Sequence, residues 1–184
     1  MSNKLNLTLV LGSAREGRVS EKVFSFVNEK AKTLEDVNLK TVDVADFLFG
    51  RTIPPWEDNE KTSTWKKIVS DSDAFVFVIP EYNHGYPGEF KILLDSAYEE
   101  YSKKPVLLVT VSDGPWGGAR MAEHLKPILQ NLGLIVLPKV LHTSFADKKF
   151  ENGSWPEEEY QKQLNGLLKE LVEYSRGLKL LREV

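Results

Sequence analysis

The segment Pro80–Gly88 combines polar, aromatic and glycine residues directly after the apolar run Ala74–Ile79. Asn83 and the backbone can hydrogen-bond the carbonyls and nitrogens of a ring, and two tyrosines can flank a flat aromatic ligand. The glycines let the backbone come close to such a ligand. The segment therefore indicates a binding surface for an aromatic ring. The alternative is a solvated turn before a helix, in which Glu81 caps or pairs locally and His84 is an ordinary surface histidine.

A second loop, Gly12–Ser20, carries hydroxyl groups and two guanidinium groups into the start of a predicted helix. Together with the free N–H groups of a helix N-terminus, these groups suit a phosphate. The loop is not a nucleotide P-loop, because Arg18 and Val19 stand where that motif needs Lys and Ser or Thr, and it has no GxGxxG pattern. Taken alone it also fits a helix cap followed by solvated charges, but its place after the first strand favours the phosphate.

A third loop, Ser112–Arg120, follows another apolar run and leads into another predicted helix. Amide N–H groups of Gly114, Gly117 and Gly118 can close the far edge of a bound ring. The alternative is a glycine-containing turn that only connects a strand to a helix.

Composition narrows the chemistry that these loops can perform. The 184 residues carry a net charge of −3 and no dense Lys/Arg block, so neither nucleic acid nor an anionic membrane is an expected partner. There is no cysteine, and the three histidines are far apart in the chain, so thiolate catalysis and a zinc site are not expected. Any redox chemistry must therefore rest on a bound cofactor. With no apolar run near the roughly 20 residues that span a bilayer, and no signal peptide pattern, the cytoplasm is the expected location.

Apolar runs alternate with segments of helical periodicity along the chain. The predicted strands are Leu5–Leu11, Leu39–Val44, Ala74–Ile79, Pro105–Val111 and Leu134–Leu137, the last with an optional extension through Val140–Leu141. The predicted helices run from Ser20 to about Leu34, from Thr62 to Ser70, from Gly88 to Tyr101, from Met121 to Leu132 and from Glu157 to Ser175, with loops at Asp46–Lys61 and Ala146–Pro156.

Most of these strands lack polar alternation, so both faces of the sheet must be covered. We predict an α/β fold with a five-stranded parallel sheet of strand order 2-1-3-4-5 and a single domain over residues 1–184. Ligands of such sheets bind beyond the carboxyl ends of the strands, where the strand order reverses. The first, third and fourth strands are neighbours in this order, so the three loops converge on one crevice.

Three motifs in these loops resemble those of the NAD(P)H-dependent FMN reductase family. They are GSxR…S after the first strand, PEYNxxxPGxxK after the third and SDGxxGGxR after the fourth, in a match from about Leu5 to Pro138. The resemblance implies a flavodoxin-like three-layer sandwich that binds FMN. It implies that the phosphate is held by Ser13, Arg15, Arg18, Val19 and Ser20. It also implies an isoalloxazine ring along Pro80, Glu81, Tyr82, Asn83, His84 and Gly85, with Ser112, Gly114, Gly117 and Gly118 completing the pocket.

The activity that this resemblance implies is a two-electron oxidoreductase. NADPH or NADH would deliver a hydride to the flavin, which would pass electrons to a small acceptor such as a quinone, an azo compound or free flavin. No side chain is expected to act as a nucleophile. Two rivals stay open: a flavodoxin-like single-electron carrier without its own NAD(P)H activity, and a nucleotide-binding protein without redox function.

The resemblance also implies a homodimer, or alternatively a homotetramer, in which the partner borders each pocket. Ile92, Tyr98 and Tyr101 make the helix Gly88–Tyr101 more apolar than one core-facing stripe requires, which can mark an interface. The alternative is that these side chains pack under a neighbouring loop. The run Lys91–Ser96 departs from the family, whose members commonly have Asn after this lysine, so details of this helix are expected to differ.

Overall fold

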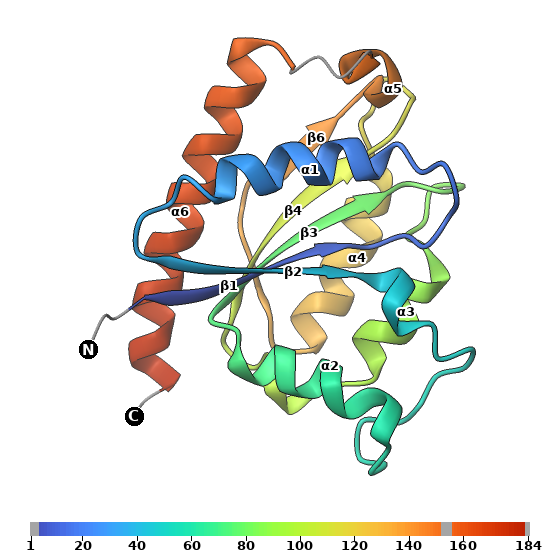
Figure 1. Ribbon diagram of the computed structural model, residues 1–184, viewed down its shortest axis with the longest axis vertical. Coiled ribbons are helices and arrows are strands. Elements are labelled where there is room, and N and C mark those ends of the chain that lie inside the picture. Colours follow the sequence, from blue (N-terminus) through green and yellow to red (C-terminus); the bar gives the residue numbers. More distant parts are fainter. Residues whose placement is uncertain (1–3, 152–155, 183–184) are drawn as a thin grey trace.

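A computed structural model describes residues 4–151 and 156–182, and its centre is a parallel β-sheet (Figure 1). The strands lie in the order β2-β1-β3-β4-β5, with β6 also paired to β4. Their bounds are β1 Leu5–Leu11, β2 Val37–Asp43, β3 Ala74–Pro80, β4 Pro105–Val111, β5 Ile135–Val136 and β6 Leu141–Thr143. The predicted fold class and strand order are confirmed.

Helices cover both faces of this sheet (Figure 1). Every residue of β3 and β4 is buried, which explains why the two strands read as unbroken apolar runs. One face packs against α1, Ser20–Ala31, and α6, Glu158–Arg182. The other face packs against α2, α3 and α4, which span Glu60–Asp71, Gly88–Asp95 and Ala119–Asn131.

The edge of the sheet beside β4 differs from the prediction, because two short strands stand where one strand was expected. Two short strands, β5 and β6, both pair in parallel with β4, β5 at its start and β6 at its end. Pro138 lies between them and has no N–H group to contribute to a ladder. This break carries the chain to the end of β4, where the segment after β6 reaches the crevice.

The predicted helix Gly88–Tyr101 is also divided. The helix α3 ends at Asp95, and a short 3₁₀ helix, η2, covers Glu99–Tyr101. Tyr101 is fully buried and accepts a hydrogen bond from Trp65 Nε1 at 3.0 Å, so the alternative of packing inside the molecule is the correct one for Tyr101. Burial raises the pKa of the Tyr101 hydroxyl far above its ordinary value. Tyr98 remains 48% exposed.

Other boundaries shift for local reasons. The helix α2 begins at Glu60, because the Asn59 side chain accepts a hydrogen bond from Lys61 N. A 3₁₀ turn, η1, occupies Val44–Phe47, and a short helix, α5, occupies Ala146–Lys149 within the predicted loop. Residues 152–155 of that loop lie outside the described residues.

The closing helix α6 continues beyond the predicted end at Ser175 to Arg182. Its apolar stripe ends near Leu171, so periodicity alone does not predict the last two turns. Two ion pairs hold these turns in place: Lys179 Nζ lies 3.0 Å from Asp73 Oδ2, and Arg182 Nη2 lies 2.8 Å from Asp73 Oδ1.

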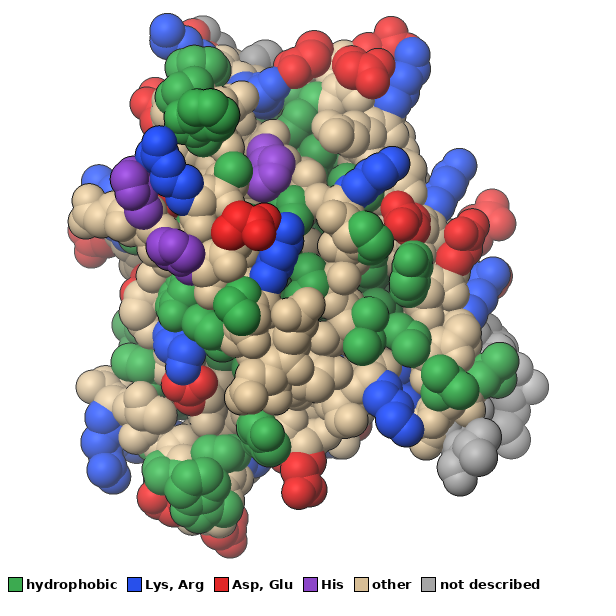
Figure 2. Space-filling model, turned by 180° about the vertical axis from the view of Figure 1, so that it is seen from behind, with side chains coloured by type: hydrophobic (Ala, Val, Ile, Leu, Met, Phe, Trp, Pro, Cys, Tyr) green, Lys and Arg blue, Asp and Glu red, His purple; other side chains and the backbone are tan. Residues whose placement is uncertain are grey.

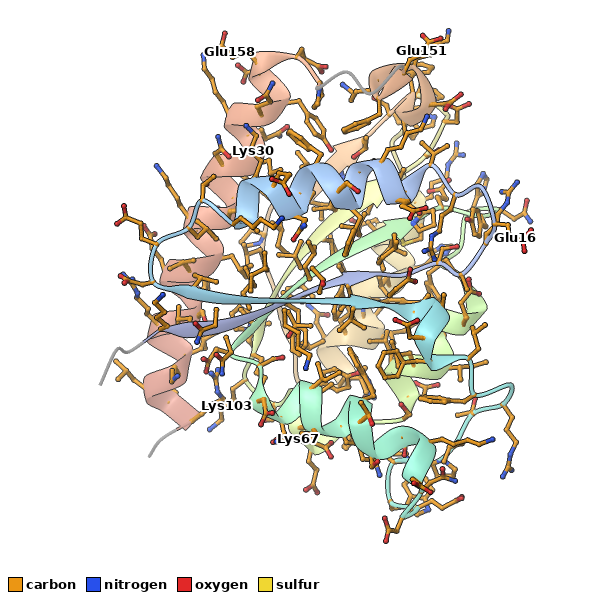
Figure 3. All side chains as sticks on the ribbon, viewed as in Figure 1. Glu16, Lys30, Lys67, Lys103, Glu151 and Glu158 are labelled. Atoms are coloured by element: carbon orange, nitrogen blue, oxygen red, sulfur yellow. The ribbon has the colours of Figure 1, made fainter. Side chains whose placement is uncertain are left out.

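The parallel strands give the sheet two distinct ends. Glu16, in the loop after β1, lies at the carboxyl end, whereas Lys103, just before β4, lies at the opposite end (Figure 3). The loops that follow β1, β3 and β4 all emerge at the carboxyl end, as the predicted convergence requires.

Candidate functional site

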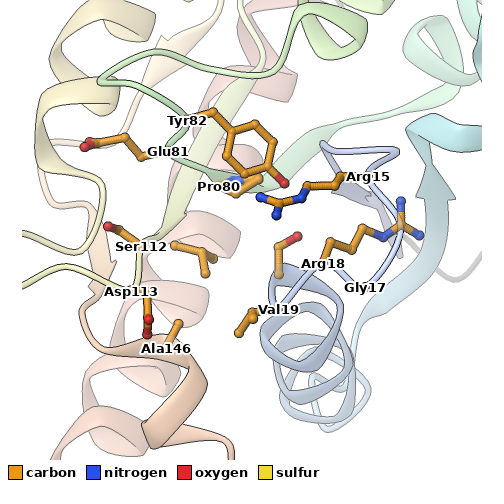
Figure 4. A pocket seen from close by; sticks show the side chains of 12 residues that line it. Arg15, Gly17, Arg18, Val19, Pro80, Glu81, Tyr82, Ser112, Asp113 and Ala146 are labelled. Carbon is orange, nitrogen blue, oxygen red and sulfur yellow. The ribbon is translucent and has the colours of Figure 1, made fainter.

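An open cavity of about 220 Å³ lies at the carboxyl end of β1, β3 and β4 (Figure 4). Residues of all three predicted loops line it together with Ala146 from the start of α5. The lining consists of Arg15, Gly17, Arg18, Val19, Ser20, Pro80, Glu81, Tyr82, Val111, Ser112, Asp113 and Ala146. The three loops thus meet at one place, beside neighbouring strands.

The start of α1 presents unpartnered donors to this cavity. In the part of the chain that the structure describes, the amide N–H groups of Arg18, Val19 and Ser20 donate no hydrogen bond to the protein. The Ser20 hydroxyl is buried and has no partner either. Buried polar groups without partners are rare in folded proteins, so each one calls for an explanation. An oxyanion bound at this helix start would satisfy all of them.

The two arginines of the first loop face different directions. The Arg15 guanidinium points into the cavity and lies 5.5 Å from the centroid of the Tyr82 ring (Figure 4). The Arg18 guanidinium turns toward β2, where it donates to both carboxylate oxygens of Asp43 and to the Ser13 carbonyl. The Arg18 side chain is only 10% exposed. Arg15 is therefore the cation available to a ligand, and Arg18 fixes the loop against the sheet.

Ser13 supports the loop from inside. It is fully buried, its hydroxyl lies 3.0 Å from Tyr82 Oη, and it accepts a hydrogen bond from Arg15 N at 3.3 Å. Glu89, in the first turn of α3, accepts a hydrogen bond from Ala14 N at 2.8 Å. These contacts tie the first loop to the second, so Tyr82 and the Arg15 side chain are held on a common framework.

The second loop makes a tight turn. Tyr82 and Gly85 exchange both backbone hydrogen bonds at 2.9 Å, and Asn83 and His84 between them have φ values of +50° and +65°. This is the geometry of a two-residue turn with both central residues left-handed, a conformation that Asn and His tolerate better than most residues. The turn directs Asn83 and His84 to solvent, outside the cavity lining.

Glu81 lines the cavity but directs its carboxylate toward α4. Its Oε2 accepts a hydrogen bond from Met121 N at 3.0 Å in the first turn of that helix. The backbone of Glu81 is fixed as well, because its N–H donates to Val111 O at 2.8 Å. The Glu81 side chain therefore caps the start of α4, 40 residues further along the chain, and does not pair locally.

The glycines of the third loop serve the fold more than the cavity. A Cβ on Gly118, which has φ of +85°, would lie 2.8 Å from Thr110 Cβ, and one on Gly117 would lie 2.9 Å from Ser144 N. Both positions therefore need glycine so that the loop can pack against β4 and the segment after β6.

His142 Nδ1 lies 2.8 Å from Thr110 Oγ1, and burial lowers the pKa of the His142 imidazole.

Sequence reasoning predicted part of this site. The structure brings nine of the predicted residues together: Arg15, Arg18, Val19, Ser20, Pro80, Glu81, Tyr82 and Ser112 line the cavity, and the Ser13 hydroxyl lies beside Tyr82. Asn83, His84, Gly85, Gly114, Gly117 and Gly118 are outside the lining. Gly17, Val111, Asp113 and Ala146 were missed.

A signal existed for only some of the missed residues. Asp113 stands inside the Ser-Asp-Gly run directly after β4, so its position in the third loop was the available signal. Ala146 reaches the cavity because β6 pairs with the end of β4, which periodicity did not show. The Ala146 amide donates to Ser112 O at 3.2 Å and closes that side.

The donor set fits a phosphorylated ligand with a flat ring. Unpartnered amides, a buried hydroxyl and a free guanidinium gather at the start of α1, while the Tyr82 ring and the backbone of Pro80 and Ser112 lie across the cavity. This arrangement at a strand-order reversal of a parallel sheet is that of a flavodoxin-like mononucleotide-binding protein.

Comparisons with known proteins identify the family. Residues 5–148 match the model of the NADPH-dependent FMN reductase family, and the chain belongs to that family. An NAD(P)H-dependent FMN reductase of Schizosaccharomyces pombe is 30% identical, with 92% of this chain and 88% of the relative covered. A quinone reductase of Escherichia coli is 32% identical, with 76% and 77% covered.

Solved structures share the fold at lower identity. A flavoenzyme NAD(P)H:acceptor oxidoreductase of Paracoccus denitrificans superposes with a TM-score of 0.76 at 22% identity, covering 94% of this chain and 98% of the other. A flavodoxin from the domain Archaea gives a TM-score of 0.60 at 9% identity, with 94% and 99% covered. The predicted family and the prediction of an NAD(P)H-dependent FMN oxidoreductase are confirmed.

One further property concerns membranes. Within residues 4–151 and 156–182, the helices are too short or too polar to cross a bilayer.

Proposed function

We propose that the cavity holds FMN and that the protein passes two electrons from NADPH or NADH to a small-molecule acceptor of the quinone class. The observation that carries this proposal is the set of unpartnered donors at the start of α1, with the Arg15 guanidinium beside them. A dianionic phosphate matches that set in charge and in the number of acceptor oxygens.

The proposed roles of the residues follow from their positions. The amides of Val19 and Ser20, the Ser20 hydroxyl and the Arg15 guanidinium bind the phosphate. Pro80, Tyr82 and Ser112 orient the ring from the opposite wall, and Arg18 and Ser13 hold the loops in register. When bound, FMN supplies the hydride and electron chemistry that no side chain of this cysteine-free chain provides.

The acceptor class is inferred from the relatives. Curated relatives in Escherichia coli and Pseudomonas putida are named quinone reductases, and an azoreductase shares the fold. A planar acceptor is compatible with a cavity that is open on one side and walled by an aromatic ring. Azo compounds and free flavin are planar as well, and we include them in the proposed class.

The enzyme is favoured over the single-electron carrier for a specific reason. The similarity to flavodoxins is one of fold alone, at 9% and 16% identity for two of them, whereas enzymes of the reductase family reach 30% or more over most of the chain. We further propose a single domain, a cytoplasmic location and a homodimer. The exposed Tyr98 beside exposed Trp56 supports an interface near α3.

The test is anaerobic mixing of the purified, FMN-loaded protein with NADPH and, separately, NADH. We expect bound flavin colour to be lost at one equivalent of nucleotide and restored when a quinone is added. A protein that is colourless and takes up no added FMN would refute the proposal. Failure of both nucleotides to bleach the flavin, while dithionite does, would favour the carrier.

Light scattering tests the proposed homodimer. It should give twice the 20.9 kDa chain mass, and a single-chain mass would refute the dimer.

A further inference from the structure

The loop between η1 and α2 exposes a tryptophan beside a second cavity. This open cavity has a volume of about 270 Å³ and is lined by Pro55, Trp56, Tyr98, Glu99 and Glu100. Trp56 is 86% exposed and Tyr98 is 48% exposed. Two aromatic rings and two carboxylates therefore border one space, separate from the cavity at the carboxyl end of the sheet.

Aromatic rings combined with carboxylates have the chemistry that binds an organic cation. The face of an indole attracts a cation, and carboxylates attract its charge and accept its hydrogen bonds. Among the residues that the structure describes, no cation lies over Trp56, and neither Glu99 nor Glu100 forms an ion pair. Trp116 shows the contrast, because the Arg120 guanidinium of the same chain lies 6.0 Å from the centroid of its ring.

The charges around this second cavity leave it negative. Residues 52–60 and 98–100 contain three and two carboxylates, respectively, and no Lys or Arg. Glu100 Oε2 accepts a hydrogen bond from Tyr98 N at 3.0 Å, which fixes the carboxylate and keeps its charge. Lys66 of α2 packs against the loop, but its Nζ donates to two carbonyl groups there, at 2.6 and 3.1 Å. A further cation is therefore attracted to this cavity.

Arg51, in the same loop, is an exposed cation that forms no ion pair within residues 4–151 and 156–182. Ile53, which follows it by two residues, is 2% exposed and anchors the loop in the interior. The contacts of Lys66 hold the loop on the other side of that anchor, at Pro55 O and Glu57 O. Arg51 does not line the cavity of its own chain. A cation on a loop fixed in this way loses little freedom when it binds elsewhere.

A twofold axis would make this loop complementary to its own copy. In a dimer with such an axis every contact occurs twice, so a loop that carries both a cation and a cation site can exchange them with its counterpart. A guanidinium stacks on aromatic rings and binds carboxylates through its planar fork. At the lower left of Figure 2, where the loop before α2 lies, hydrophobic side chains gather with acidic ones beside them.

We propose that the second cavity binds Arg51 of the partner subunit in a homodimer, and that each dimer contains this contact twice. The guanidinium lies against Trp56 and Tyr98 and pairs with the carboxylates of Glu99 and Glu100. This inference rests on the proposed homodimer, which is part of the proposed function, and it names the contact that orients the two chains.

Charge reversal tests the contact through the dissociation constant of the dimer, measured by sedimentation equilibrium on the full-length protein. Arg51→Glu places a carboxylate against two others at both contacts. The dissociation constant should rise about 100-fold or more, which is about tenfold for each contact. Glu99→Arg should have the same effect. The double variant Arg51→Glu, Glu99→Arg exchanges the two charges and should return the constant to within about tenfold of the wild type.

Lys61→Glu is the matched control, because it makes the same charge change at another exposed cation, ten residues further along the chain. It should leave the dissociation constant within about threefold of the wild type. Added salt should weaken the wild-type dimer and strengthen the residual association of Arg51→Glu, because it screens attraction in one and repulsion in the other. Trp56→Ala removes the indole and no charge, so it should weaken the dimer about tenfold and keep the wild-type salt dependence.

The outcomes separate the contact from the rest of the proposed function. Dimers as tight in Arg51→Glu and Glu99→Arg as in the wild type would overturn the contact and leave the homodimer standing. A double variant that does not recover association would overturn it as well. A single-chain mass of the wild type at every concentration would overturn both contact and homodimer, whereas the reduction of bound flavin is measured independently. If Arg51→Glu does not fold, Glu99→Arg and its salt dependence decide.

Discussion

At the amino end of the sheet, Asp73 pairs with two cations, whereas at the carboxyl end the Arg15 guanidinium lies near the Tyr82 ring and forms no ion pair with a described residue. Asp73 accepts from Lys179, from Arg182 and from Asn6 N at 2.8–3.0 Å, and these donors come from two elements, α6 and β1. Arg15, in the described part of the chain, contacts only the Tyr82 ring through its guanidinium.

Hydroxyl groups repeat this difference. At the amino end, Thr8 and Ser72 hydrogen-bond each other at 2.7 Å, and Ser72 also donates to Ile68 O. At the carboxyl end the buried Ser20 hydroxyl has no partner. A buried polar group without a partner costs roughly 1–3 kcal/mol of stability. The start of α1 therefore gives up stability to keep a donor ready for a ligand, whereas the Asp73 cluster stabilises the fold.

Asp73→Ala should produce the largest effect on folding, and it removes contacts only at the amino end of the sheet. It leaves two cations and the Asn6 amide without their acceptor, which we expect to lower the free energy of unfolding by about 3 kcal/mol. FMN affinity should not change. Urea unfolding and FMN titration measure the two quantities. Asp36→Ala, which breaks an exposed pair with Arg176, is the control and should cost less than about 1 kcal/mol.

Arg15→Ala changes the cavity at the carboxyl end of the sheet, so its effect should appear in FMN binding. Losing a charge-assisted hydrogen bond to the phosphate should weaken FMN affinity by about 1.5–3 kcal/mol. The stability of the FMN-free protein should stay within about 0.5 kcal/mol, because the side chain is exposed and has no ion pair. Unchanged FMN affinity at low and high salt would show that Arg15 is merely solvated.

Arg18→Ala is the natural contrast within the same loop. Because Arg18 is paired with Asp43, its removal should lower the unfolding free energy as well as the FMN affinity. If Arg15→Ala and Arg18→Ala behaved alike, the distinction between a ligand-facing and a loop-fixing arginine would fail.

Ser20→Ala should move stability and binding in opposite directions, by about 1 kcal/mol each. Removing a buried hydroxyl that has no partner relieves a desolvation cost, so the FMN-free protein should become more stable. The same change deletes a donor to the phosphate, so FMN should bind more weakly. Thermal unfolding with and without FMN measures both effects. A less stable FMN-free variant would mean that Ser20 has an internal partner.

The convergence of the three loops could be predicted from sequence because it depends on strand patterning and strand order alone. Apolar runs marked β1, β3 and β4, and parallel strands deliver their carboxyl ends to one edge. Which groups face the ligand could not be predicted, because the residue types in a loop do not show which way each group points. Gly117 and Gly118 resemble ligand-facing glycines in sequence, yet the space behind them belongs to Thr110 and Ser144.

Long-range pairing explains the other differences. Arg18 and Asp43 are 25 residues apart, and only the β1–β2 pairing brings Asp43 beside the first loop. The last two turns of α6 depend on Asp73, more than 100 residues earlier in the chain. Local periodicity carries no information about such contacts, so the ends of elements and the partners of charged residues were the least predictable features.

Lys104 offers the smallest and most specific test of the amino end, through pH. The residue is 6% exposed, and its Nζ donates to Val69 O at 2.5 Å and to Ser70 O at 2.9 Å. Burial, followed by the positive charge of Arg182, lowers the pKa of Lys104 from 10.5 to about 8. The folded ammonium group thus loses its proton at a lower pH than the same group in the unfolded chain.

The sign of the pH dependence follows from that lowered pKa. Between about pH 8 and pH 10.5 the unfolded chain holds more protons than the folded protein at Lys104, so this group makes the unfolding free energy rise with pH. Below about pH 8 the cost of burying the charge is present in full. Relative to Lys104→Met, which cannot titrate, the wild type should gain up to about 1 kcal/mol between pH 8 and pH 9. Urea unfolding of both proteins across that range measures the difference in slope. Parallel pH profiles would contradict the lowered pKa and would show that the acceptors around the Lys104 ammonium group offset the cost of burying its charge.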